Sequence, residues 1–330
     1  MIPVNGWAAL TAPISLREPP LFAALAPAQR VLIAGAGGGF DVYAGLPLAL
    51  ALAKEGKRVH LGNLTFSDLS GLALDNWVAP GVAAIGPESA GPRDYFPERT
   101  LASWLAGGSL DPVVYAFERV GVQPLRRAYR ELVESLQVDA IVLVDGGTDI
   151  LMRGDEAGLG TPEEDMASLV AVAGLDVPVR LVVCAGFGID SFHGVCHAHV
   201  LENIAALDRD GAYLGALSIP ARSEEGMAYL DAVSHAQEHT PHHPSIVNGQ
   251  IAAAMCGVFG DKHFTTRTGG SELFINPLMA VYFSFQLTGV YKRLLYKGFV
   301  ELTHTWTQMG MAIDRFRLMT DPRKRVAIPH

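Results

Sequence analysis

The chain has 330 residues, 49% of them hydrophobic, and a formal net charge of −9. This length and composition allow a large buried core, whereas the acidic balance and the lack of a long basic run argue against a nucleic-acid partner. The three cysteines, Cys184, Cys196 and Cys256, include no close pair. Such usage is typical of a reducing compartment, so we expect a cytoplasmic protein.

The first residues lack a basic stretch followed by an apolar one, and the longest apolar run, LPLALALA from Leu46, is too short to cross a bilayer. We therefore expect no membrane partner. Residues 1–30 are rich in proline and alanine. Because the proline pair in LREPPLF would break the interior of a helix, we expect residues 1–30 to form an arm that wraps around the fold.

From Val31 on, short β-branched runs alternate with longer amphipathic stretches, which is typical of a parallel sheet with crossover helices. The predicted strands are VLIAG from Val31, VHLGNL from Val59, VAAI from Val82, VVYA from Val113, AIVLVD from Ala140, VRLVVCAG from Val179 and AYLGALSI from Ala212. The predicted helices between them are PLALALAKEG, QPLRRAYRELVESL, PEEDMASLVAVAG and HAHVLENIAAL. The sequence thus predicts an α/β fold with a doubly wound, mostly parallel, Rossmann-like sheet.

Beyond Ser223 the pattern becomes mainly helical. The predicted helices are SEEGMAYLDAVSHA, PSIVNGQIAAAM and MAVYFSFQLTGVYKRLL, with one short strand, ELFIN from Glu272. Because no low-complexity linker separates residues 223–330 from the sheet, we expect one domain over residues 1–330, with these helices packing on the sheet and roofing its ligand edge. A separate helical subdomain is the alternative. We expect the aromatic segment MAVYFSFQLTGVY to be a core helix, with the face of a homo-oligomer as the alternative.

Ligands of open parallel sheets bind outside the carboxyl ends of the strands, where the following helices point their positive N-termini inward. The first loop at this edge, GAGGGFD, runs from Gly35 to Asp41. Glycine permits positive φ angles and lets an anionic group approach backbone N–H groups closely. We therefore expect ligand contacts from this loop, at Gly35, Gly37, Gly38, Gly39 and Asp41.

This first loop matches the dinucleotide-binding fingerprint only in part. The third glycine of G-x-G-x-x-G falls at Phe40, and the next strand ends in Gly62 and Asn63 instead of an acid. A P-loop does not fit either, since no Gly-Lys-Ser/Thr follows. A nicotinamide or other nucleotide cofactor is therefore an alternative, and an ordinary tight turn is another.

The second loop follows AIVLVD and contains Asp145, Gly146, Gly147, Thr148 and Asp149. Two acids four residues apart, flanked by glycines, suit a divalent cation such as Mg²⁺, the hydroxyls of a sugar or an amine. We expect Asp145 and Asp149 to be catalytic, and Gly146, Gly147 and Thr148 to contact the ligand. The alternative is that both acids cap the next turn and pair with Arg153.

The third loop contains Gly186, Gly188, Asp190 and His193, and His197 follows. We expect the two glycines to contact the ligand and Asp190 to orient His193 as a general base, both being catalytic. If the chain is helical from His193, this residue shares a face with His197. The candidate metal ligands are then Asp145, Asp149, Asp190, His193 and His197, although the zinc spacing H-E-x-x-H is missing.

Later loops add further candidates. Arg267, Gly269 and Gly270 are expected to form a second anion cradle, or an ordinary turn into ELFIN, and Arg222 follows a predicted strand. The histidine tract HTPHHP around His242 is expected to be an exposed loop, with a lid over the site as the alternative.

Three motifs in this order, GAGGGFDVYAGLPLA, VDGGTDILMRGDE and GFGIDSFHG, resemble the family numbered 1152 among domains of unknown function. The resemblance covers most of the chain, from about Val31 to near the C-terminus. It implies a Rossmann-like α/β core. It implies no reaction and no functional residue.

Acids dominate the three main loops. They are Asp41, Asp145, Asp149, Asp155, Glu156 and Asp190, against the single Arg153. A polyphosphate site would need more lysine and arginine or a magnesium ion, whereas glycine amides plus acids suit a sugar phosphate, nucleoside, nucleotide or amino acid.

The leading hypothesis is an enzyme that acts on such a small polar metabolite, by acid–base or metal-assisted chemistry. Lyase, isomerase, hydrolase and transferase reactions all fit this hypothesis. An NAD(P)- or nucleotide-dependent oxidoreductase and a non-catalytic metabolite or nucleotide sensor are the alternatives. All of these readings require that the three loops surround one cavity.

Overall fold

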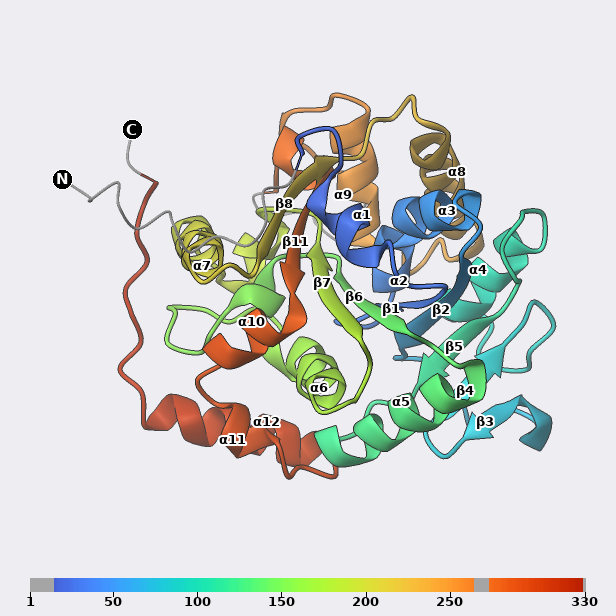
Figure 1. Ribbon diagram of the computed structural model, residues 1–330, viewed down its shortest axis with the longest axis horizontal. Helices are drawn as coiled ribbons and strands as arrows, with labels where there is room; N and C mark the ends of the chain where they lie inside the picture. The colour runs from blue at the N-terminus through green and yellow to red at the C-terminus, as the bar shows by residue number, and fades with distance from the viewer. Residues whose placement is uncertain (1–14, 264–272, 329–330) are drawn as a thin grey trace.

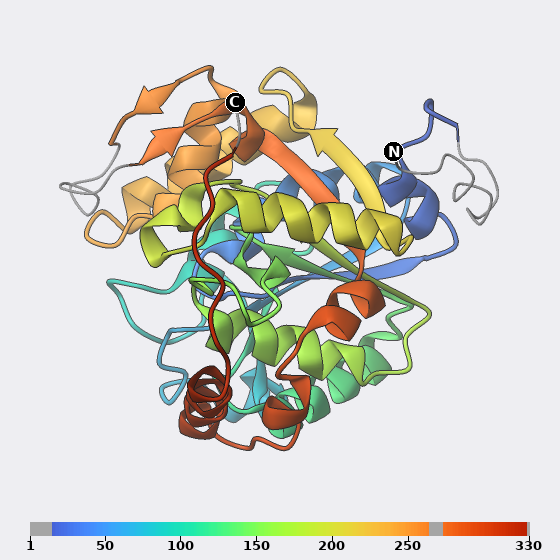
Figure 2. The ribbon, with the colours of Figure 1, turned by 90° about the vertical axis from the view of Figure 1, so that its left-hand side faces the viewer.

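A computed structural model describes residues 15–263 and 273–328. In this part of the chain, a nine-stranded sheet in the order β3-β4-β5-β2-β1-β6-β7-β11-β8 lies between two layers of helices (Figures 1 and 2). The strands are β1 Arg30–Gly35, β2 Arg58–Leu64, β3 Trp77–Ala79, β4 Val82–Ile85, β5 Val114–Phe117, β6 Ala140–Asp145, β7 Val179–Cys184, β8 Tyr213–Ser218 and β11 Val281–Gln286. The short pair β9 Gly260–Asp261 and β10 Phe274–Ile275 forms a second sheet. The predicted α/β fold class is confirmed.

The centre of the sheet is parallel and doubly wound. Strands β5, β2, β1, β6 and β7 are neighbours in this order and run in the same direction. The chain moves outward from β1 through β2 to β5, then returns to β6 on the other side of β1. The switch point therefore lies between β1 and β6, and this is where ligands bind in such folds.

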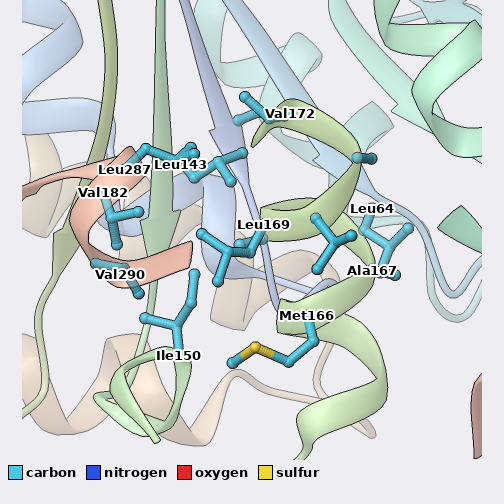
Figure 3. Close-up of a cluster of buried hydrophobic side chains, with 14 of the residues drawn as sticks. Leu64, Leu143, Ile150, Met166, Ala167, Leu169, Val172, Val182, Leu287 and Val290 are labelled. Carbon is cyan, nitrogen blue, oxygen red and sulfur yellow. The ribbon is translucent and has the colours of Figure 1, made fainter. Parts of the chain in front are cut away.

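Helices cover both faces of the sheet, which is why its central strands are apolar throughout. One layer contains α5 Val122–Leu136, α6 Pro162–Ala173, α7 His197–Arg209, α10 Leu287–Arg293, α11 Lys297–Val300 and α12 Trp306–Leu318. The other contains α1 Pro20–Leu25, α2 Asp41–Ala44, α3 Leu46–Lys54, α4 Pro97–Leu105 and α8 Glu224–His239, with Ile251 of α9 Ile246–Met255 in the same core. Figure 3 shows the first core, where Leu143 and Val182 of the sheet lie beside Leu169 of α6 and Val290 of α10.

One predicted helix is wrong. Residues 281–286, inside MAVYFSFQLTGVYKRLL, form strand β11, which pairs antiparallel with both β7 and β8, and only Leu287–Arg293 is helical. Tyr282, Phe283 and Phe285 are buried. A strand covered on both faces gives a continuous apolar run that periodicity does not distinguish from a buried helix. Residues 223–330 therefore supply a strand inside the sheet, as well as helices on it.

Part of the expected N-terminal arm is helical. Helix α1 begins at Pro20, and its Leu21 and Leu25 are buried. Proline suits the first position of a helix, because its fixed φ angle is helical and its missing N–H group would have no partner there. The second proline of the pair thus starts a helix. Residues 1–14 lie outside the described part of the chain.

No helix in the described part of the chain is long and apolar enough to cross a membrane.

Candidate functional site

A cavity of about 590 Å³ lies at the carboxyl ends of β1, β6 and β7, and all three predicted loops line it. The first loop contributes Gly37, Gly38, Gly39, Phe40 and Asp41, the second Asp145, Gly146 and Asp149, and the third Asp190 and His193. Asp41, Asp145 and Asp190 therefore face one cavity beside the switch point of the sheet.

Other segments complete the cavity wall, and the sequence analysis did not identify their side chains as site residues. They are Phe66 after β2, Tyr95 before α4, Thr161, Glu164 and Asp165 at the start of α6, and His243, Ser245, Ile246 and Val247 around the start of α9. In the HTPHHP tract, His242 and His243 are exposed, and His243 also lines the cavity.

Two hydrogen bonds hold the glycine loop, one within the loop and one from the end of β2. Gly37 N–H donates to Asp41 Oδ2 at 2.8 Å, and the Asn63 side chain at the end of β2 donates to the Gly39 carbonyl at 2.8 Å. Gly38 has φ 83° and Gly39 has φ 61°. A Cβ atom on Gly38 would lie 2.6 Å from the Phe66 ring, so this position needs glycine for both conformation and space.

Gly35 has a packing role instead of the predicted ligand contact. It does not line the cavity, and a Cβ atom there would lie 2.3 Å from Asn63 Oδ1 and 2.6 Å from the Val42 nitrogen. Glycine at this position lets α2 and the end of β2 approach β1 closely.

The two acids of the second loop combine capping with exposure to the cavity. Asp145 Oδ2 accepts from Ile150 N–H at 3.2 Å, and Asp149 Oδ2 accepts from the Thr161 N–H at 2.7 Å and from its hydroxyl at 3.0 Å. The alternative pairing with Arg153 is wrong, because this guanidinium lies 3.2 Å from Asp155. One oxygen of each acid is thus fixed by the backbone.

Thr148 and Gly147 shape the site through Asp190 and do not line the cavity. Thr148 N–H donates to Asp190 Oδ2 at 2.6 Å, and a Cβ atom on Gly147 would lie 2.6 Å from both carboxylate oxygens. Asp190 is buried, whereas His193 is exposed. Among the described residues no hydrogen bond joins these two side chains, so the predicted orienting contact is not formed in this structure.

The predicted two-histidine metal face is wrong. His193 ends a 3-10 turn, Gly194 follows with φ 89°, and α7 begins only at His197. His197 stacks on Phe187 with ring centroids 5.4 Å apart, and it lines a different cavity of about 740 Å³. The glycine between two helical segments therefore separates the histidines.

The remaining predicted residues lie elsewhere. Gly188 lines the second cavity with His197, and Gly186 N–H donates to the Met279 carbonyl at 2.9 Å. Arg222 is exposed and does not line the acid-rich cavity. Arg267, Gly269 and Gly270 lie outside the described residues.

The cavity concentrates negative charge. Six carboxyl groups line it, and the described lining residues include no lysine or arginine; the acids are Asp41, Asp145, Asp149, Glu164, Asp165 and Asp190. Burial raises the pKa of Asp41 to about 8 and that of Glu164 to about 7. Burial, reinforced by neighbouring carboxylates, also raises the pKa values of Asp145, Asp165 and Asp190 well above the ordinary range. These groups therefore need protons or a cation to remain together.

Asp165 differs from the other acids of the cavity. Its side chain is 1% exposed, and neither carboxylate oxygen has a hydrogen-bond partner. Asp41, Asp145 and Asp165 each offer an oxygen atom within 4.8 Å of the others. The sequence analysis identified Asp41 and Asp145 but not Asp165.

The fold and the site define a Rossmann-like α/β protein with an acid-lined cavity at its switch point. A family model described as "Protein of unknown function (DUF1152)" matches residues 76–321, which is more than half of the chain. The chain belongs to this family, and the resemblance drawn from its motifs is confirmed. The match includes the second and third loops and begins after the glycine loop. No match to a curated protein was found.

Proposed function

We propose that this protein is an enzyme that acts on a small polar metabolite bound in the 590 Å³ cavity. One observation carries the proposal: the loops after three strands and the start of α6 bring six carboxyl groups and His193 around one cavity at the switch point. The volume lies within the range of about 300–1,000 Å³ that is typical of small-molecule sites.

The lining residues favour a metabolite that bears amine or hydroxyl groups. Carboxylates accept hydrogen bonds from both, and the absence of lysine and arginine from the described wall disfavours a bare phosphate. Asp149 and Asp190 each have one oxygen engaged by a threonine, so the second oxygen is available to such a group. Phe66 and Tyr95 form an aromatic part of the wall that suits a less polar portion of the ligand.

Proton transfer is the chemistry that the side chains support. A carboxyl group with a pKa near 7 or 8, as at Glu164 and Asp41, exchanges its proton close to neutral pH. His193 is exposed and lines the same cavity, and its ring nitrogens can donate or accept a hydrogen bond. The cavity thus combines several groups that can donate or accept a proton.

The nicotinamide-dependent alternative has less support. In dinucleotide-binding folds an acid at the end of the second strand binds the ribose. Here that position is Asn63, which is 0% exposed and donates to the Gly39 carbonyl and to Glu98. This amide is committed to the interior and does not reach a ribose.

The test uses a thermal-shift screen of amines, amino acids, nucleosides and sugar phosphates, followed by mass spectrometry of incubated hits. We expect Asp190→Asn to abolish the ligand-induced shift and turnover while the protein stays folded. Glu163→Gln is the matched control, because Glu163 lies beside the site acids on α6 but does not line the cavity. Tight binding without any product would favour the sensor, and an unchanged response in Asp190→Asn would contradict the proposal.

A further inference from the structure

We infer that Asp41, Asp145 and Asp165 together bind one divalent cation, Mg²⁺ or Mn²⁺, in the acid-lined cavity. This inference deepens the proposed function, because it gives the same cavity a cofactor. It replaces the ligand set expected from the sequence, which combined two histidines with acids of the second and third loops. The new set takes one acid from each of three elements: α2, β6 and α6.

The spacing of the three carboxylates suits a single ion. Their nearest ligand atoms lie within 4.8 Å of one another. In an octahedral Mg²⁺ site the metal–oxygen distance is about 2.1 Å, so ligand oxygens lie about 3 Å apart when adjacent and about 4.2 Å apart when opposite. The three carboxylates are therefore close enough for one ion to draw them into contact through small side-chain movements.

Asp165 supplies the independent indication of a ligand. A buried carboxylate normally accepts hydrogen bonds, because losing water without any replacement is costly. Both oxygens of Asp165 lack a partner although the side chain is 1% exposed. A bound cation would replace the hydrogen-bond partners that the Asp165 carboxylate lacks.

Gly37 keeps the space between two of the carboxylates open. A Cβ atom on Gly37 would lie 2.6 Å from Asp41 Oδ2 and 2.9 Å from Asp165 Oδ1. Any other residue would therefore push these carboxylates apart. The glycine loop and the start of α6 thus enclose a gap with an acid on each side.

The two other acids are oriented by backbone groups. Asp41 Oδ2 accepts from Gly37 N–H at 2.8 Å, and Asp145 Oδ2 accepts from Ile150 N–H at 3.2 Å. Gly146 also donates a backbone hydrogen bond to Asp41. A carboxylate has about four acceptor sites, so both acids keep lone pairs for the ion. A set made only of carboxylates selects a hard cation such as Mg²⁺ or Mn²⁺ over zinc or copper, which prefer nitrogen and sulfur ligands.

Cation binding can be measured without a substrate. The full chain is treated with EDTA, dialysed and titrated with MnCl₂, with the free ion followed by electron paramagnetic resonance, and thermal unfolding is recorded with and without Mn²⁺ or Mg²⁺. We expect saturable binding of about one ion per chain and a higher Tm for the wild type. Asp165→Asn should weaken Mn²⁺ binding at least about tenfold and lose the rise in Tm. Glu163→Gln should behave like the wild type.

Either of two binding results would overturn the inference: no saturable binding by the wild type, or equal binding by Asp165→Asn. If Asp165→Asn does not fold, Asp41→Asn is the second variant, with the same expected loss. Metabolite turnover that persists unchanged in EDTA would overturn the cation site and leave the proposed enzyme standing. Mn²⁺ binding by a protein that responds to no metabolite would support the cation site and count against the proposed enzyme.

Discussion

The loop after β6 contributes residues to two clusters of acids. The clusters differ in whether a basic side chain accompanies the acids. The cavity cluster is made of Asp41, Asp145, Asp149, Glu164, Asp165 and Asp190, and no lysine or arginine lies among its described neighbours in the wall. The bracket cluster is made of Asp155, Glu156 and Glu202, and Arg323 contacts all three of them. Each cluster contains a fully buried acid, Asp165 in one and Glu156 in the other, but only the bracket cluster has an arginine in contact with its acids.

The bracket cluster fastens the end of the chain. After α12 the chain runs in an extended conformation along the side of the molecule (Figure 2), and Arg323 lies on this segment. Glu156 is 0% exposed and accepts hydrogen bonds from Gly154 N–H at 2.8 Å and from Asn203 at 2.8 Å. A buried acid with every partner in place is a structural element, whereas a buried acid without partners points to a missing ligand.

The largest expected loss of stability comes from replacing a carboxylate by an amide in the bracket cluster. Glu156→Gln replaces one carboxylate oxygen with an NH₂ group, which faces either the N–H donors of Arg153 and Gly154 or the donors of Asn203 and Arg323. In both orientations a donor faces a donor, and the charge that pairs with Arg323 is lost. We expect a loss of about 3 kcal/mol in the free energy of unfolding. Urea denaturation at neutral pH measures this loss.

Asp155→Asn is the control for that change, because Asp155 is only partly buried and its partners are side chains. We expect it to cost less than about 1 kcal/mol. If the two variants were equally stable, the backbone contacts of Glu156 would not be what makes the bracket cluster structural.

Glu98 on α4 is intermediate between the two clusters in the number of hydrogen-bond partners that its carboxylate has. One of its oxygens accepts from Asn63 at 2.7 Å, and the other has no partner. Burial raises the pKa of Glu98 from its ordinary 4.5 to about 7. Because the folded value is the higher one, the contribution of Glu98 to stability is complete below about pH 4.5 and is lost as the pH rises through 7.

Glu98→Gln imitates the protonated acid at every pH. We expect this variant to match the wild type near pH 4.5 and to be more stable by about 3 kcal/mol at pH 8. The difference in unfolding free energy between the two proteins, measured by urea denaturation across this range, isolates Glu98 from the other acids. A difference that did not change with pH would show that Glu98 stays ionised in the folded protein.

The sequence predicted the central sheet because its strands are buried on both faces. AIVLVD, which is followed by Gly146, and RVLIAG, which ends in Gly35, each identify a strand and the loop after it. The position of β11 was not predictable in the same way. Its pairing with β7 and β8 joins segments about a hundred and about seventy residues away, and VYFSF alone suits a buried helix as well as a strand.

The candidate site was predictable where an acid ends a strand. Asp145 ends β6 and Asp190 lies in the loop after β7, and both line the cavity. Asp165 does not, because acids in the first turn of a helix are common and favoured by the helix dipole. One signal was present in the sequence: Asp165 begins the run DMASLVAV, in which Ser168 is the only other polar residue. The structure buries all of this run. An acid at the start of an otherwise buried helix turn needs a reason beyond the dipole.

The two clusters are expected to differ in the sign of the stability change that follows when a carboxylate is replaced by an amide. Removing the charge of a buried carboxylate that has no partner should stabilise the cation-free protein, so we expect Asp165→Asn to gain about 1 kcal/mol in EDTA. Glu156→Gln, the same chemical change, should lose stability under those conditions. Urea denaturation of both variants and the wild type, with and without Mn²⁺, shows whether each substitution raises or lowers the free energy of unfolding. If Asp165→Asn lost stability in EDTA as Glu156→Gln does, the carboxylate would already have a partner within the protein, and the two clusters would differ only in position.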